Sequence, residues 1–169
     1  MLEHASTSRR DILLAPLLAT FIGKEAMAAG VDPAMTIIQQ QDQIKWEVAL
    51  DRPQGTAEYA NLWNKPSEPG PYLTLVKWYP GFMSAPHWYE TDRFSIVVSG
   101  TWWVGSGDRF DPDNTVPVPA GGFVHRIART SHFDGVLRQA KEPAVIAICG
   151  TGPIKFHKTD EGEPSWRVL

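Results

Sequence analysis

The sequence predicts an all-β protein, a sandwich or barrel of short strands. Segments rich in β-branched and aromatic residues recur along the chain, and turn-forming residues bound each of them. From residue 35 onward no long segment shows the apolar spacing of an amphipathic helix. The 14 glycines and 14 prolines supply the frequent turns that such a fold needs. A chain of 169 residues is long enough for one domain with a buried core.

The expected strands follow one another along the chain. They are residues 44–50, 72–78, 94–98, 101–104, 123–127 and 144–149. Residues 66–71 form a proline-rich breaker cluster, and residues 111–114 read as a turn. Residues 57–63 are expected to form one or two helical turns. After residue 153 the chain becomes polar, so residues 156–169 are expected to run as a surface tail that Trp166 holds down.

Composition and charge limit the functions that the chain can have. The formal net charge is -3 and the isoelectric point is near 5.9, which argues against a nucleic-acid-binding surface. Hydrophobic residues make up 43% of the chain and charged residues 21%, as in globular proteins. The single cysteine, Cys149, rules out an internal disulfide. Because it lies in an apolar run, Cys149 is expected to be a small buried hydrophobic residue.

The N-terminal residues resemble a twin-arginine export signal. Arg9 and Arg10 precede an apolar run over residues 12–22, and an Ala-Met-Ala cleavage pattern ends at Ala28. The apolar run is too short to span a bilayer. We therefore expect an export signal over residues 1–28 and a periplasmic or otherwise exported mature protein that is not integrated in a membrane. The alternative is an N-terminal amphipathic helix of the folded domain.

Two segments carry the histidines that are candidates for a functional site. The first contains His87, and strand alternation places His87 and Tyr89 on one face with Trp88 on the other. The second contains His125 and His132, which are seven residues apart with a turn between them. We expect His132 at the site and His125 on the surface. The structural alternative is that His87 and His132 are hydrogen-bonded core residues and that Tyr89 is a packed aromatic.

These segments resemble the two sequence motifs of the cupin superfamily. Gly81, the five residues after it, His87 and the closing Gly100 match the first motif, and Gly122 with His132 matches the second loosely. The resemblance covers about residues 70–153 and is to small single-domain bacterial cupins. It implies an RmlC-like jelly roll, or double-stranded β-helix. On this basis we divide the chain into N-terminal strands and an arm (29–70), a cupin barrel (71–153) and a C-terminal tail (154–169).

The chain departs from the cupin metal-ligand pattern at two of four positions. The resemblance places His87 and His132 at the first and fourth ligand positions and Tyr89 at the second. The glutamate position falls on Arg93, or on Phe94 if the gap is one residue longer. The resemblance implies a divalent Mn, Fe, Ni or Zn ion on His87 and His132, with three further candidate ligands that the sequence leaves open: Glu90, Asp92 and His125. If Arg93 points inward it would repel a cation and favour an anion-binding pocket.

Three functions are compatible with these residues. The first, which we expect, is a degenerate metal-dependent enzyme of the dioxygenase, isomerase or lyase type, with Tyr89 and Arg93 as catalytic residues. The second is a metal-free module that binds or senses a small molecule, with an anion placed beside Arg93. The third is a structural jelly roll without a working pocket. A small-molecule partner follows from the first two, and a homodimer is compatible with all three because unpaired edge strands need covering.

Overall fold

The computed structural model describes residues 32, 34–48 and 51–169. The expected export signal over residues 1–28 lies outside the described residues. The chain divides into two units, residues 1–39 and residues 40–169. Of the first unit the structure describes a turn, in which the backbone amides of Met35 and Thr36 donate to the carbonyl of Asp32. No helix among the described residues has the length and apolar character that crossing a membrane requires.

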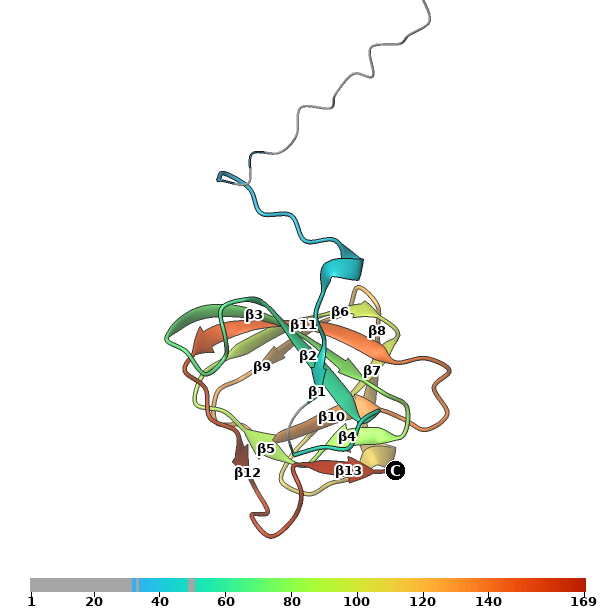
Figure 1. Ribbon diagram of the computed structural model, residues 1–169. Helices are drawn as coiled ribbons and strands as arrows, with labels where there is room; N and C mark the ends of the chain where they lie inside the picture. Colours follow the sequence, from blue (N-terminus) through green and yellow to red (C-terminus); the bar gives the residue numbers. More distant parts are fainter. Residues whose placement is uncertain (1–31, 33, 49–50) are drawn as a thin grey trace, which may run out of the picture. The chain divides into compact units, whose positions relative to one another are not determined.

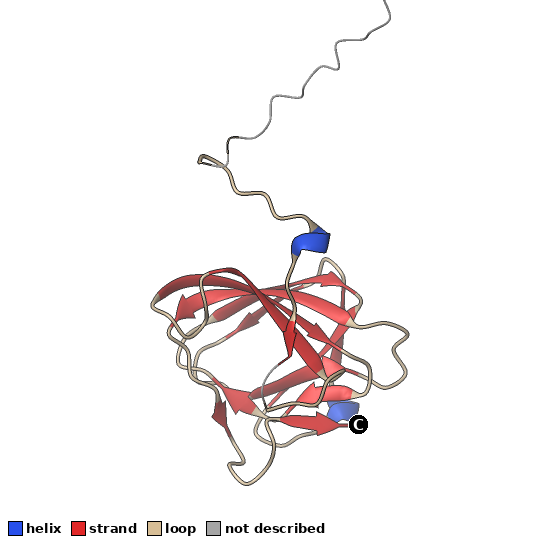
Figure 2. Cartoon of the chain, viewed as in Figure 1, coloured by secondary structure: helices blue, strands red, loops and turns tan. Residues whose placement is uncertain are grey.

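The described part of the second unit is built from two antiparallel sheets that face each other, and its helical elements are two short 3-10 turns, Gln41–Gln43 and Pro112–Asn114 (Figures 1 and 2). The first sheet has six strands. In spatial order they are β1 (Glu47–Val48), β2 (Ala57–Trp63), β3 (Gly70–Trp78), β11 (Ala144–Gly152), β6 (Arg93–Ser99) and β9 (Phe123–Arg126).

The second sheet has seven strands. A path of five runs in the order β12 (His157–Lys158), β5 (His87–Trp88), β10 (His132–Val136), β4 (Phe82–Ser84) and β13 (Trp166–Val168). β7 (Thr101–Ser106) also pairs with β10, and β8 (Val116–Pro119) pairs with β7. Strands distant in sequence are therefore neighbours in both sheets, as in a jelly roll.

Residue alternation along the strands builds the core between the sheets. On β11 the side chains of Ala144, Ile146 and Ile148 are buried, and Val97 on β6 packs beside them. Close approach of backbones also contributes to the packing. A side chain at Gly135 would collide with the Phe82 carbonyl, so β10 and β4 can approach closely only with glycine there.

The predicted all-β class is confirmed, and β3, β6, β7, β9 and β11 coincide with predicted strands. The expectation of helical turns over residues 57–63 was wrong, because this segment is strand β2. Its buried alanines, Ala57 and Ala60, are three residues apart, which imitates a helical spacing. Pairing with β3 overrides that local pattern, and Thr74 donates a hydrogen bond to Asn61 across the pair, 2.8 Å long.

Two further expectations need correction. Residues 156–169 are not only a surface tail, because they contain β12 and β13, which extend the second sheet. Trp166 does anchor this segment, since its indole N–H donates to the Asp51 carbonyl at 3.1 Å. Cys149 is exposed rather than buried. Alternation on β11 turns Ile148 inward and Cys149 outward, and an apolar run does not reveal which parity faces the core.

Candidate functional site

The register between β5 and β10 brings His87 and His132 together. The two residues are direct cross-strand partners, and side chains at paired positions lie on the same face of a sheet. Both are 3% exposed, and their ring centroids are 4.4 Å apart. The structure therefore joins the two histidines that the sequence predicts, which lie 45 positions apart in the chain.

Backbone carbonyls set the tautomer of both imidazoles. His87 Nδ1 lies 2.8 Å from the carbonyl oxygen of Ala85, and His132 Nδ1 lies 2.9 Å from that of Thr130. A carbonyl only accepts, so each Nδ1 must carry the proton and donate it. The Nε2 atom of each neutral ring is then a hydrogen-bond acceptor.

Arg93 opens strand β6 and points into the barrel. Its side chain is buried, with the residue 9% exposed. The Nη2 atom donates to His132 Nε2 at 3.2 Å, and the guanidinium carbon lies 3.7 Å from the centre of the Tyr89 ring. No carboxylate in the described part of the chain forms an ion pair with Arg93, and its Nε atom has no hydrogen-bond partner there.

The two histidines and two tyrosines around Arg93 are uncharged at neutral pH. Burial, and after it the nearby charge of Arg126, lowers the pKa of His132 from 6.5 to about 4. Burial, together with His132 and Arg93, places the pKa of His87 well below its ordinary value. Burial raises the pKa values of the Tyr72 and Tyr89 hydroxyls, although Arg93 opposes both shifts. The two phenols are therefore neutral groups that can donate hydrogen bonds.

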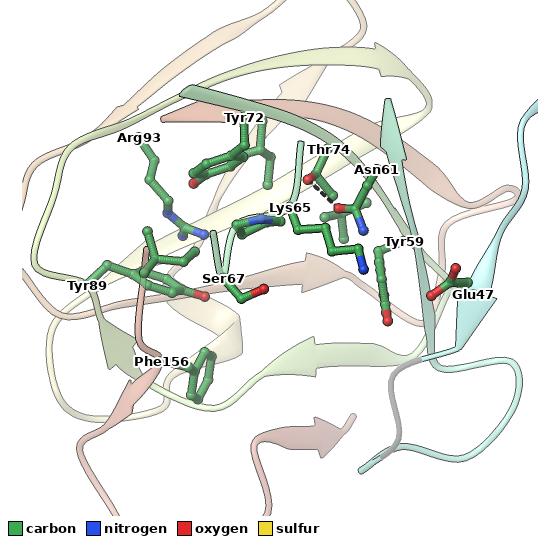
Figure 3. A pocket seen from close by; sticks show the side chains of 14 residues that line it. Glu47, Tyr59, Asn61, Lys65, Ser67, Tyr72, Thr74, Tyr89, Arg93 and Phe156 are labelled. Atoms are coloured by element: carbon green, nitrogen blue, oxygen red, sulfur yellow. Dashed lines mark hydrogen bonds between the residues drawn. The ribbon is translucent and has the colours of Figure 1, made fainter. Parts of the chain in front are cut away.

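Two adjacent chambers, which share part of their lining, adjoin Arg93. The outer chamber has a volume of about 490 Å³ and the inner one about 160 Å³, and Tyr89, Arg93 and Phe156 line both. Figure 3 shows Arg93, Tyr72 and Tyr89 at one end of the outer chamber. Volumes of this size and walls that are mostly aromatic and aliphatic are typical of small-molecule sites.

Phe156 is a site residue that the sequence analysis missed. It precedes β12, and its ring stacks on His87 with centroids 4.2 Å apart and planes 18° apart. The expected surface tail therefore supplies part of the cavity wall. The only sequence signal was an aromatic residue in a polar segment, and such residues are common without a site nearby.

A buried ion pair behind the histidines was also missed. Arg126 Nη2 lies 3.3 Å from Asp134 Oδ2, and each side chain is 9% exposed. Asp134 also accepts a 3.2 Å hydrogen bond from the Trp102 indole. Strand parity would have indicated Arg126, because an outward His125 requires an inward neighbour.

The three additional candidate ligands lie outside the cavity. Asp92 accepts hydrogen bonds from His125 at 2.8 Å and from the Ala128 amide at 2.8 Å. Glu90 is paired with His157, which stacks on Trp88 on the other face of β5. His125 is on the surface, as expected from its parity.

The residues present do not fit a divalent metal ion. Among the described residues, no three His, Cys, Asp or Glu side chains are grouped as such an ion would require. A guanidinium occupies the acceptor side of His132 Nε2, the atom that a metal would need. The metal on His87 and His132 stays a prediction, and the geometry favours the anion-binding alternative.

Comparison with known proteins identifies the fold. No protein-family model matches the chain, and no curated protein matches its sequence. Solved structures do match. The polyketide cyclase RemF from Streptomyces resistomycificus is similar with a TM-score of 0.63 and 15% identity, over 78% of this chain and 90% of that one. An RmlC-like cupin from Ralstonia eutropha JMP134 matches with a TM-score of 0.57 and 15% identity, over 79% and 76%.

KdgF from Halomonas sp. is also similar, with a TM-score of 0.51 and 18% identity, over 67% of this chain and 93% of that one. The fold and the site thus define a class: an all-β, two-sheet protein with the RmlC-like cupin fold and an internal cavity. At these identities the likeness concerns the fold alone.

Proposed function

We propose that this protein binds a small organic anion in the cupin cavity, without a metal, and that Arg93 is the anion-binding residue. The observation that carries the proposal is the state of Arg93. It is buried at the junction of the two chambers and has no carboxylate partner in the described chain. A buried cation without a counter-ion is unfavourable, and a ligand carboxylate would supply that counter-ion.

Other cavity groups support an anionic ligand. Tyr72 and Tyr89 are neutral donors beside the guanidinium, so they can add hydrogen bonds to a bound carboxylate. Lys65, whose side-chain amine can donate hydrogen bonds to an anion, also lines the outer chamber. The carboxylates that line the cavity are already engaged: Asp134 with Arg126, Glu58 with Lys77 at 2.8 Å, and Glu47 in a hydrogen bond with Tyr59.

The protonation states favour binding over acid–base catalysis. An efficient general acid or base has a pKa near the working pH. The pKa of His132 is about 4, that of His87 is also well below neutral, and those of both tyrosines are raised. The similar structure RemF is a polyketide cyclase by name, so the fold accommodates enzymes. For this chain, the role of Arg93 and Tyr89 that the geometry supports is ligand binding.

The first test replaces Arg93 by methionine, which has a similar length and no charge. A panel of organic acids is screened by thermal unfolding, since a ligand of the native state alone raises Tm. We expect at least one acid, at about 100 times its Kd, to raise Tm by about 5–10 °C in the parent. In Arg93→Met we expect its affinity to fall at least about 30-fold, the loss that follows from about 2 kcal/mol of charge pairing.

The matched control is Arg109→Met, which removes an arginine that is exposed on the loop after β7. It is expected to bind the acids as the parent does. Equal affinities in the parent and in Arg93→Met, or no Tm shift with any anion, would show that the cavity is not an anion site.

The second test concerns the metal. Protein from medium that contains manganese, iron, nickel and zinc is purified and its metal content measured. Because Arg93 occupies the acceptor side of His132, we expect much less than one metal ion per chain. Near-stoichiometric metal in the parent and none in a His87→Ala/His132→Ala double variant would contradict the proposal and establish the metal-dependent alternative.

A further inference from the structure

A histidine that lines the inner chamber carries an acceptor that no described residue uses. His87 lines this chamber, and its Nδ1 atom is committed to the Ala85 carbonyl. The other ring nitrogen, Nε2, has no hydrogen-bond partner within residues 32, 34–48 and 51–169. Ser84 lines the same chamber, and its hydroxyl oxygen accepts the amide of Asp134 at 3.0 Å, which leaves the hydroxyl proton free.

The chamber has the size and walls for one flat ring. Its volume of about 160 Å³ is close to the ~150 Å³ of a protein cavity that holds one benzene molecule. Trp78, Tyr89 and Phe156 contribute aromatic walls, and Val76 and Ile148 contribute aliphatic ones. Arg52, Glu58 and Asp134 line the same chamber, and the two carboxylates are paired with Lys77 and with Arg126. Aromatic walls favour an aromatic guest through offset or edge-to-face packing.

The acceptor of His87 and the guanidinium of Arg93, which has no carboxylate partner among the described residues, are close enough for one small molecule to contact both. His87 packs edge-on against the Tyr89 ring with centroids 5.2 Å apart, and the Arg93 guanidinium lies over the same ring at 3.7 Å. Both residues line the inner chamber. A ligand that satisfied both would need an acidic group and a hydrogen-bond donor on one compact body.

We propose that the ligand is an aromatic hydroxy acid, whose carboxylate pairs with Arg93 and whose hydroxyl donates to His87 Nε2 in the inner chamber. This inference rests on the proposed anion-binding function and names its ligand class. The hydroxyl provides the selectivity, because a bound acid without it would shield His87 Nε2 from water and leave this acceptor unpaired. The ring provides the area that the aromatic walls cover.

The experiment is a calorimetric titration with compounds that differ by one group. The hydroxybenzoates and hydroxycinnamates carry all three features. Benzoate and cinnamate lack the hydroxyl, phenol lacks the carboxylate, and hydroxycyclohexanecarboxylates lack the aromatic ring. We expect at least one hydroxyaryl acid to bind at least tenfold more tightly than its counterpart without the hydroxyl and than its saturated counterpart, and phenol to bind more weakly than either acid.

Two variants assign the hydroxyl contact. His87→Phe keeps a ring that can stack on Phe156 but removes the acceptor. It is expected to lose the tenfold preference while it retains the affinity for benzoate or cinnamate. His87→Gln restores an acceptor oxygen and is expected to recover part of the preference, which separates a lost hydrogen bond from a damaged fold.

The outcomes distinguish this inference from the proposed function. Binding of aryl acids without a hydroxyl preference would overturn the inference and leave the anion site in place. Tighter binding of aliphatic dicarboxylates or inorganic phosphate than of any hydroxyaryl acid would also overturn the inference and leave the anion site in place. A preference that survives in His87→Phe would also overturn it. No binding of any anion would remove the proposed function itself.

Discussion

Replacing Asp134 by alanine is expected to lower the free energy of unfolding by about 3–5 kcal/mol, the range for breaking a buried ion pair from one side. Arg126 would lose its partner at 3.3 Å and remain a buried cation. The Trp102 indole N–H would lose its acceptor as well. Arg93 and Arg126 would then lie in the same barrel with no described carboxylate paired to either.

Urea unfolding at pH 7 measures this loss of stability. Two further variants show how much of the loss comes from the ion pair. Asp134→Asn keeps the shape and an acceptor for Trp102 but removes the charge, so it isolates the ion pair. The double variant Asp134→Ala/Arg126→Met is expected to be more stable than Asp134→Ala alone, because no unpaired charge stays buried. If the loss of stability in the double variant equalled the sum of the losses in Asp134→Ala alone and in Arg126→Met alone, the ion-pair explanation would fail.

Acidification is expected to destabilise the fold strongly between pH 6.5 and pH 4. The unfolded chain protonates His132 near its ordinary pKa of 6.5, whereas burial holds the pKa in the fold at about 4. In this window the unfolded state binds more protons, so stability falls as the pH is lowered. The shift corresponds to about 3 kcal/mol at ~1.4 kcal/mol per pH unit. His87, whose pKa is also lowered, acts in the same direction.

Burial and the charges facing His132 together account for the direction of this prediction. Burial is the main cause of its lowered pKa; Arg126 and Arg93 act in the same sense, and Asp134 opposes them. Urea titrations from pH 7.5 to pH 4.5 measure the slope. His132→Gln keeps an acceptor for Arg93 but cannot titrate, and it is expected to reduce the loss of stability by about 2 kcal/mol. An unchanged profile in this variant would rule out His132 as the main source.

Most of the fold was predictable because strand signals are local. Alternation and flanking glycine and proline residues predict β3, β6 and β11, and these three strands contribute many of the core residues. The short strands β4 and β10 were not predicted with bounds, and β5 was expected only as a strand through His87, since two to five residues give too little pattern. They form because partners on other parts of the chain complete their hydrogen bonds.

The candidate site was predictable residue by residue but not in its contacts. The resemblance to cupins singled out His87, Tyr89, Arg93 and His132, and the structure does bring these four together. The resemblance does not indicate that the Arg93 guanidinium donates a hydrogen bond to His132 Nε2. That contact decides which of the two sequence-derived hypotheses, a cation or an anion in the pocket, the geometry supports.

The sequence by itself determined the all-β class and singled out His87, Tyr89, Arg93 and His132, but it left open whether Arg93 points into the barrel. Only the tertiary structure decided that Phe156 closes on His87 and that Asp134 pairs with Arg126. The reason is physical. Alternation fixes the face of each side chain locally, whereas its neighbour across the barrel depends on register and sheet closure, which join residues far apart in the chain.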